Sequence, residues 1–101
     1  MELQRSQFEG REGEVFHLQI DDETLITLTL TEIASPDDRY LQQARELGIR
    51  EPFNMLFSGP LAPFLTQKMY KLQHHELDDI ELFLVPVKQD QLHYFYEAVF
   101  A

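Results

Sequence analysis

The sequence of 101 residues contains no cysteine, which excludes disulfide bridges and thiolate metal sites. Basic residues are also few: eight Lys and Arg stand against 18 Asp and Glu, and the formal net charge is −10. Because nucleic-acid binding needs Lys and Arg to replace counterions, this balance predicts no nucleic-acid partner. The charge fits either simple solubility or a basic partner, and net charge alone does not separate the two.

Long apolar runs are missing as well. No stretch reaches the length of a transmembrane helix, and residues 1–5 begin no apolar segment of a signal peptide. We therefore expect a cytoplasmic protein with no membrane partner. Apolar residues still make up 44% of the chain, which is ordinary for a globular protein, and the length suits one domain over residues 1–101.

Short runs of apolar and β-favouring residues, separated by turn signals, fill most of the chain. In residues 24–33, Ile26, Leu28 and Leu30 alternate with threonines, which is typical of a half-buried antiparallel strand. Five more strands are expected at residues 14–20, 53–58, 69–74, 80–87 and 93–100.

Three of these strands carry more specific expectations. In residues 14–20, Phe16, Leu18 and Ile20 share one face. Residues 80–87 are nearly all apolar and predict a central strand covered on both faces, with Pro86 near a strand end, a bulge or an edge. This strand should pair with residues 93–100 in a final hairpin. The expected buried side chains of the two strands are Leu82, Leu84, Tyr96 and Phe100.

One segment has the pattern of a helix. Ser35 is a good N-cap, Pro36 suits the first helical position, apolar residues then recur at helical spacing up to Leu47, and Gly48 is a natural stop. We expect a short helical insert near residues 36–47. Six strands and one helix, without βαβ alternation, predict a mainly β fold: a small six-stranded antiparallel β-barrel or β-roll.

Four motifs in the second half of the chain carry a family resemblance. They occupy Phe53 to Pro60, Tyr70 to His74, Leu82 to Pro86 and Tyr96 to Phe100. In this order they resemble an uncharacterised family of short bacterial proteins, catalogued only as a domain of unknown function, whose members carry F-x-L-L-F-x-G-P, Y-x-L-x-H, L-F-L-V-P and Y-E-A-V-F segments. The resemblance covers roughly residues 8–100, with Met55 and a longer insert at 35–51 as departures. It implies assembly or scaffold work beside phage-tail-like proteins and brings no catalytic residue.

The densest run of possible metal ligands is His74, His75 and Glu76 with Asp78 and Asp79. Adjacent strand residues point to opposite faces, so the two histidines can share a metal only if the strand ends there. A strand-end histidine that hydrogen-bonds a turn fits the run better. We expect no metal and no cofactor.

Catalytic patterns are equally weak. Glu81 and Glu97 lie in otherwise apolar strands and could form an acid–base pair if they were close; otherwise each faces solvent or pairs with Lys71 or Arg50. The serines lie in no nucleophile motif, and four dispersed glycines form no phosphate loop. We predict that the protein is not an enzyme.

These observations leave three function hypotheses. The leading one is a non-enzymatic protein that binds other proteins, with a homo-oligomer left open, through aromatic residues on outward strand faces. Its candidate contact residues are Phe83, Tyr94 and Phe95. The alternative is a barrel that binds a small ligand in an interior lined by Phe53, Phe57, Tyr70 and Tyr94. The third is an enzyme using Glu81 and Glu97 or His74 and His75.

Overall fold

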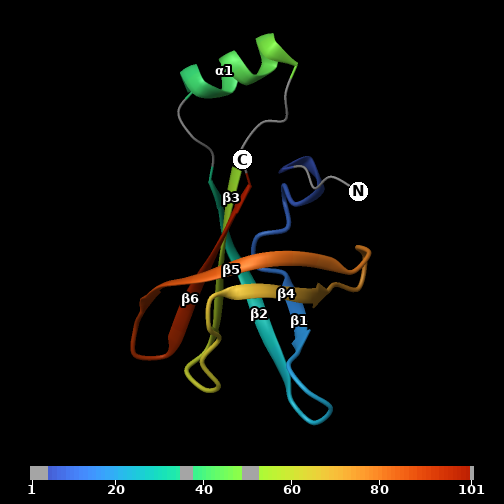
Figure 1. Ribbon diagram of the computed structural model, residues 1–101, viewed down its shortest axis with the longest axis vertical. Helices are drawn as coiled ribbons and strands as arrows, with labels where there is room; N and C mark the ends of the chain where they lie inside the picture. Colours follow the sequence, from blue (N-terminus) through green and yellow to red (C-terminus); the bar gives the residue numbers. More distant parts are fainter. Residues whose placement is uncertain (1–4, 35–37, 49–52, 101) are drawn as a thin grey trace.

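The strands of this protein close into a six-stranded antiparallel barrel (Figure 1). The computed structural model describes residues 5–34, 38–48 and 53–100, without the side chains of residues 38, 40, 41, 99 and 100. In chain order its elements are η1 (Arg5–Gln7), β1 (Val15–Gln19), β2 (Leu25–Ala34), α1 (Asp38–Leu47), β3 (Phe53–Pro60), β4 (Lys68–Gln73), β5 (Ile80–Gln89) and β6 (His93–Phe100). The predicted mainly β fold and its barrel form are confirmed.

The strand order around the barrel is β1-β2-β3-β6-β5-β4, with every pair antiparallel. β5 and β6 form the expected final hairpin. β1 and β2 form another hairpin, while β3 and β6 pair along their whole length. The closing pair, β1 with β4, is much shorter: only His17↔Gln73 and Leu18↔Leu72 are in register. We call this narrow junction the seam.

The core fills the interior of the barrel, because the inward residues of all six strands are apolar. Ile26, Leu28 and Leu30 of β2 are buried as expected. So are Leu82, Leu84 and Tyr96, whereas the side chain of Phe100 lies outside the described residues. Phe8, after η1, adds a fully buried ring that packs on Phe53 with the centroids 6.2 Å apart.

Two expectations about strand faces are wrong. β1 ends at Gln19, so Ile20 leaves the strand at the turn and is 41% exposed instead of sharing the inward face. β5 pairs with a strand on each side, β4 and β6, but only its inward face is covered. On its outward face, Phe83 and Val87 are 44% and 47% exposed. A barrel has a single layer, and its outer face meets solvent wherever no further element packs on it. Pro86 lies at a bulge between β5 and β6, as expected.

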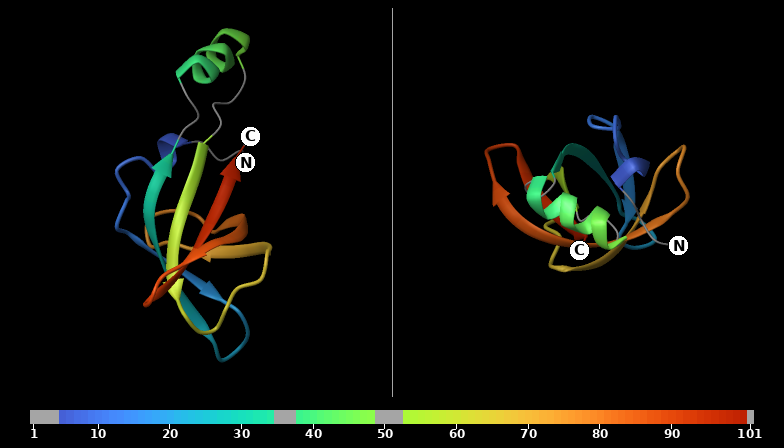
Figure 2. Two further views of the ribbon diagram at one scale, coloured as in Figure 1. Left: turned by 90° about the vertical axis from the view of Figure 1, so that its left-hand side faces the viewer. Right: turned by 90° about the horizontal axis from the view of Figure 1, so that it is seen from above.

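Helix α1 stands away from the barrel at the end where β2 leaves and β3 enters (Figure 2). It stops at Gly48, whose φ of +71° favours glycine and whose N–H donates to the carbonyl of Arg45. The expected capping residues Ser35 and Pro36 lie outside the described residues. None of the described residues of α1 belongs to the buried cluster of the barrel. No helix in the described part of the chain is both long and apolar enough to span a membrane.

Candidate interaction surface and the polar network at the seam

An apolar surface runs along the outer face of β5 and onto its two neighbours. Phe83 lies directly across from Met69 of β4, and Val85 lies across from the outward Glu97 of β6. Met69 is 54% exposed, comparable to Phe83 and Val87, so these side chains remain uncovered. We call this surface the apolar stripe; its residues are Met69, Phe83, Val85, Val87 and Phe95.

Phe95 forms the β6 end of the apolar stripe. Its register partner in β5 is Lys88, whose Nζ lies 4.7 Å from the centroid of the Phe95 ring. The centroid of the His93 ring lies 6.2 Å from that of Phe95, in an edge-on arrangement. The cation–π contact holds Lys88 over the ring and leaves Phe95 half-buried.

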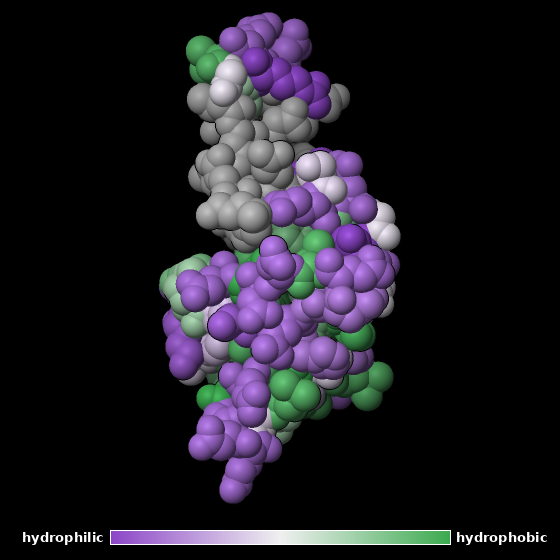
Figure 3. Space-filling view, turned by 90° about the vertical axis from the view of Figure 1, so that its right-hand side faces the viewer, coloured by the Kyte–Doolittle hydropathy of each residue, from purple (hydrophilic) through white to green (hydrophobic). Residues whose placement is uncertain are grey.

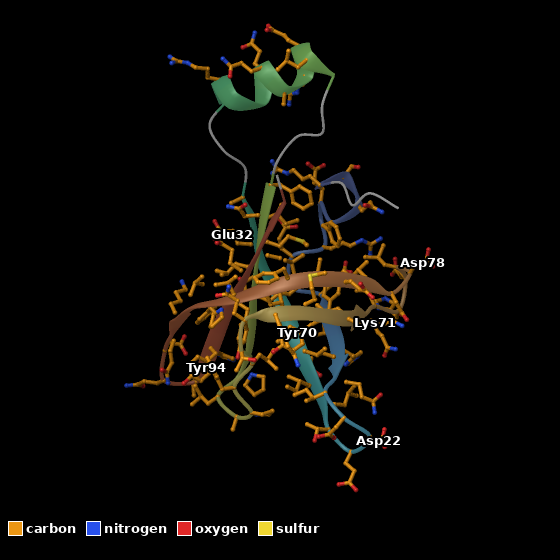
Figure 4. The ribbon with its side chains drawn as sticks, in the orientation of Figure 1. Asp22, Glu32, Tyr70, Lys71, Asp78 and Tyr94 are labelled. Atoms are coloured by element: carbon orange, nitrogen blue, oxygen red, sulfur yellow. The ribbon has the colours of Figure 1, made fainter. Side chains whose placement is uncertain are left out.

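Tyr94, the third predicted contact residue, lies on the opposite face of β6. Alternation along the strand places Tyr94 on the side of Tyr96, and their ring centroids are 6.5 Å apart. Tyr94 also packs edge-on against Phe64 of the β3–β4 loop at 4.8 Å. Figure 4 shows it near the barrel end where these loops gather. The structure thus brings Phe83 and Phe95 to one surface and Tyr94 to another.

The two histidines lie just beyond β4, which ends at Gln73. Their rings stack at 4.5 Å, and the His74 side chain is fully buried against Phe16. Nδ1 of His74 accepts a hydrogen bond from the backbone N–H of Glu76, so the proton of a neutral ring is on Nε2. Nε2 then donates to the Glu14 carboxylate at 2.6 Å. The expected strand-end histidine that hydrogen-bonds a turn is confirmed.

Arg11 completes this network across the seam. Its guanidinium contacts Glu14 at 3.1 Å and Glu76 at 3.3 Å, and Glu76 also accepts from His75 at 3.0 Å. Desolvation acts to raise the pKa of Glu14, but the hydrogen bonds of His74 and Arg11 outweigh it and hold that pKa below its usual value. Arg11, and then His75, lower the pKa of Glu76 in the same way. The network therefore fastens the start of β1 to the β4–β5 connection.

His74 is held in place by the hydrogen bonds of this network, whereas His75 is exposed. Both ring nitrogens of His74 are hydrogen-bonded, and its ring is closed to solvent. Among the described residues, no group of three or more His, Asp or Glu is arranged to hold a metal ion.

The two carboxylates considered as an acid–base pair are far apart. Glu81 faces outward opposite Lys71, while Glu97 faces outward opposite Val85, four residues further along β5. At the usual rise of a strand, this offset places their backbone positions about 13 Å apart along the sheet. Lys71 forms its ion pair with Asp79 at 3.5 Å, and Arg50 lies outside the described residues.

Three of the four residues considered as a ligand-binding lining pack inside the barrel, whereas Tyr94 is only partly buried beside them. Phe57 packs edge-on against Phe16 at 5.5 Å, and Phe53 and Tyr70 are buried as well. The hydroxyl of Tyr70 donates to the Thr66 carbonyl at 2.6 Å. Packed rings and a satisfied hydroxyl therefore fill the part of the interior that these three residues line.

The outer surface formed by the described residues includes grooves at both ends of the barrel. One, of about 440 Å³, runs between the segment at Phe8 and the β4–β5 connection. The other, of about 470 Å³, lies at the opposite barrel end between Leu25 of β2, the β3–β4 loop and Leu92. Sequence reasoning missed both grooves, and it missed Arg11 and Glu14 as partners of His74. Sixty residues separate Glu14 from His74, so no local spacing could reveal their contact.

A family model described as "Domain of unknown function" matches residues 3–100 of the chain. No curated protein and no solved structure matches it. The match spans nearly the whole sequence and is consistent with the expected uncharacterised domain family. This protein therefore belongs to the family described as Domain of unknown function (DUF6916).

Proposed function

We propose that this protein is a small non-enzymatic interaction or assembly module that binds another protein through the apolar stripe. The observation that carries the proposal is the exposure of Met69, Phe83 and Val87 on one outer face of the barrel. An outer strand face that meets only water normally carries polar residues. Burial of a contiguous apolar surface by a partner stabilises the complex by about 25 cal/mol per Å² of apolar area removed from water.

The histidine and the carboxylates that were considered as catalytic groups are also consistent with a non-enzymatic function. His74 and Glu14 are committed to fastening the seam, and Glu81 and Glu97 are too far apart to share a proton. We further propose a cytoplasmic location and work in an assembly of the phage-tail-like kind, which the motif resemblance supports. A bacterial source is part of that proposal.

The test is co-purification with the products of neighbouring genes, using the double variant Met69→Ser/Phe83→Ser. Both side chains are half-exposed, so the variant should keep the fold while losing the partner. Leu25→Ser/Leu92→Ser is the matched control, because it removes two exposed apolar side chains that do not belong to the apolar stripe. Equal retention of the partner by the wild type, the stripe variant and the control variant would rule out the apolar stripe as the contact surface.

Self-association is measured in the same experiment by light scattering over a range of protein concentrations. A dimer that the stripe variant loses and the control variant keeps would identify a second copy of this chain as the partner.

A further inference from the structure

The groove between Phe8 and the β4–β5 connection combines an apolar floor with an acidic rim. Phe8 and Ile80 are buried beneath it, and Leu77 packs partly buried against the core. The rim carries four carboxylates, from Glu76, Asp78, Asp79 and Glu81. We call this feature the acidic groove. Figure 3 views the molecule from the side where β4 turns into β5, and apolar residues emerge there between hydrophilic ones.

The four rim carboxylates differ in their partners. Glu76 is held by Arg11, and Asp79 pairs with Lys71 at 3.5 Å. Asp78 and Glu81 are exposed and form no ion pair among the described residues. The described lining of the groove contains no lysine or arginine. Two carboxylates therefore remain open to a positive charge from outside the chain.

The acidic groove adjoins the apolar stripe. Glu81 and Phe83 are two residues apart on the same outward face of β5, and Met69 lies across from Phe83. Figure 4 shows Lys71 and Asp78 at this end of the β4–β5 pair. A partner lying on the stripe would reach the groove without bending away from the surface.

We propose that the acidic groove takes an arginine or lysine side chain of the partner protein. Its aliphatic stem would lie on the floor at Leu77 and Ile80, above the buried Phe8, and its charged head would lie between Asp78 and Glu81. The chain's net charge of −10 favours approach of a basic surface and opposes an acidic one. This inference rests on the proposed function, because the same partner covers the apolar stripe.

The site is tested with two short probes, acetyl-Leu-Arg-Leu-amide and acetyl-Leu-Glu-Leu-amide, titrated into ¹⁵N-labelled protein at low ionic strength. The arginine peptide should shift the amide signals of residues 76–81, with an effect that added salt reduces. The glutamate peptide should leave them in place. Shifts spread over the whole barrel, or equal shifts with both peptides, would overturn the inference.

A pair of charge-matched variants separates a site from general attraction. Asp78→Asn/Glu81→Gln should weaken binding of the arginine peptide about fivefold, given the modest strength of exposed ion pairs. Asp22→Asn/Glu23→Gln removes the same charge from the β1–β2 turn, where Figure 4 shows Asp22 at the end of the molecule furthest from α1 and well away from Asp78. This control should bind like the wild type. An equal loss in both variants would mean that net charge alone attracts the peptide.

The same variant distinguishes this inference from the proposed function. Co-purification of Asp78→Asn/Glu81→Gln with a stripe-dependent partner should recover several-fold less of that partner than the wild type does. Full recovery would overturn the role of the acidic groove and leave the apolar stripe in place. Peptide binding at the groove without any stripe-dependent partner would contradict the proposed function alone.

Discussion

Tyr96 has a buried ring, and its hydroxyl accepts a hydrogen bond from a backbone amide. Its oxygen accepts the N–H of Leu65 at 3.0 Å, and both residues are buried. Desolvation raises the pKa of the Tyr96 phenol above its usual value, although the bond from Leu65 acts in the opposite direction. The hydroxyl therefore stays neutral at ordinary pH and ties the β3–β4 loop to β6.

Tyr96→Phe should lower the free energy of unfolding by about 1–3 kcal/mol, because the buried N–H of Leu65 loses its acceptor. Urea denaturation measures the change. Tyr94→Phe is the control, since its hydroxyl makes no hydrogen bond among the described residues. Equal stability of the two variants would show that water replaces the missing acceptor.

Leu84 and Phe83 are neighbours in β5 with opposite environments: Leu84 is fully buried, while Phe83 belongs to the apolar stripe. Leu84→Ala should cost about 2–5 kcal/mol of stability through lost burial and the cavity that remains. Phe83→Ala should cost much less, because its ring contributes little to the core. Thermal and urea unfolding of both variants test the alternation, and a cost under about 0.5 kcal/mol for Leu84→Ala would contradict its burial.

At the scale of the element, alternation of apolar and polar residues was sufficient to locate most strands. The threonines of β2 gave its inward and outward faces directly, and its observed bounds differ by one residue at each end. The nearly continuous apolar run of β5 was ambiguous, because sequence alone does not say whether a second layer covers it. The acidic groove could not be predicted from the sequence either, because its walls come from segments about seventy residues apart.

Gly59 in β3 faces a packed core rather than a turn. A Cβ added there would lie 2.7 Å from Cδ2 of Leu28, which is fully buried. Gly59→Ala should therefore destabilise the protein by about 1–3 kcal/mol, although alanine usually suits a strand better than glycine. Thermal unfolding against Ser58→Ala, its half-buried neighbour, isolates the steric effect; unchanged stability would mean that Leu28 repacks freely.

The network at the seam should make the junction of β1 and β4 sensitive to acid. Because folding lowers the pKa values of Glu14 and Glu76, their stabilising contribution is present above the unfolded pKa of about 4.3 and is lost as the pH falls. Amide protection factors, which correct for the slower intrinsic hydrogen exchange in acid, should therefore fall first near the seam as the pH falls. Glu14→Gln should flatten this pH dependence, whereas Glu12→Gln, outside the network, should preserve it; equal slopes would contradict the role of Glu14.

At the scale of the whole molecule, β6 holds the barrel together. It pairs with β3 over all eight of its residues and with β5 on its other edge, and it contributes Tyr96 and Ala98 to the core. The seam, by contrast, rests on two residue pairs and the polar network. Opening the barrel at β6 should therefore cost far more than opening it at the seam.

Deletion of residues 94–101 should prevent folding, because it leaves the edges of β3 and β5 unpaired and exposes the core. Deletion of residues 1–5 is the control: it keeps Phe8, whose buried ring packs on Phe53, and should leave the thermal unfolding transition nearly unchanged. Circular dichroism and size-exclusion chromatography compare the two truncations. A folded, soluble protein lacking residues 94–101 would show that β6 is not required by the barrel. Assembly would then be better explained by donation of this strand to a partner than by contact through the apolar stripe.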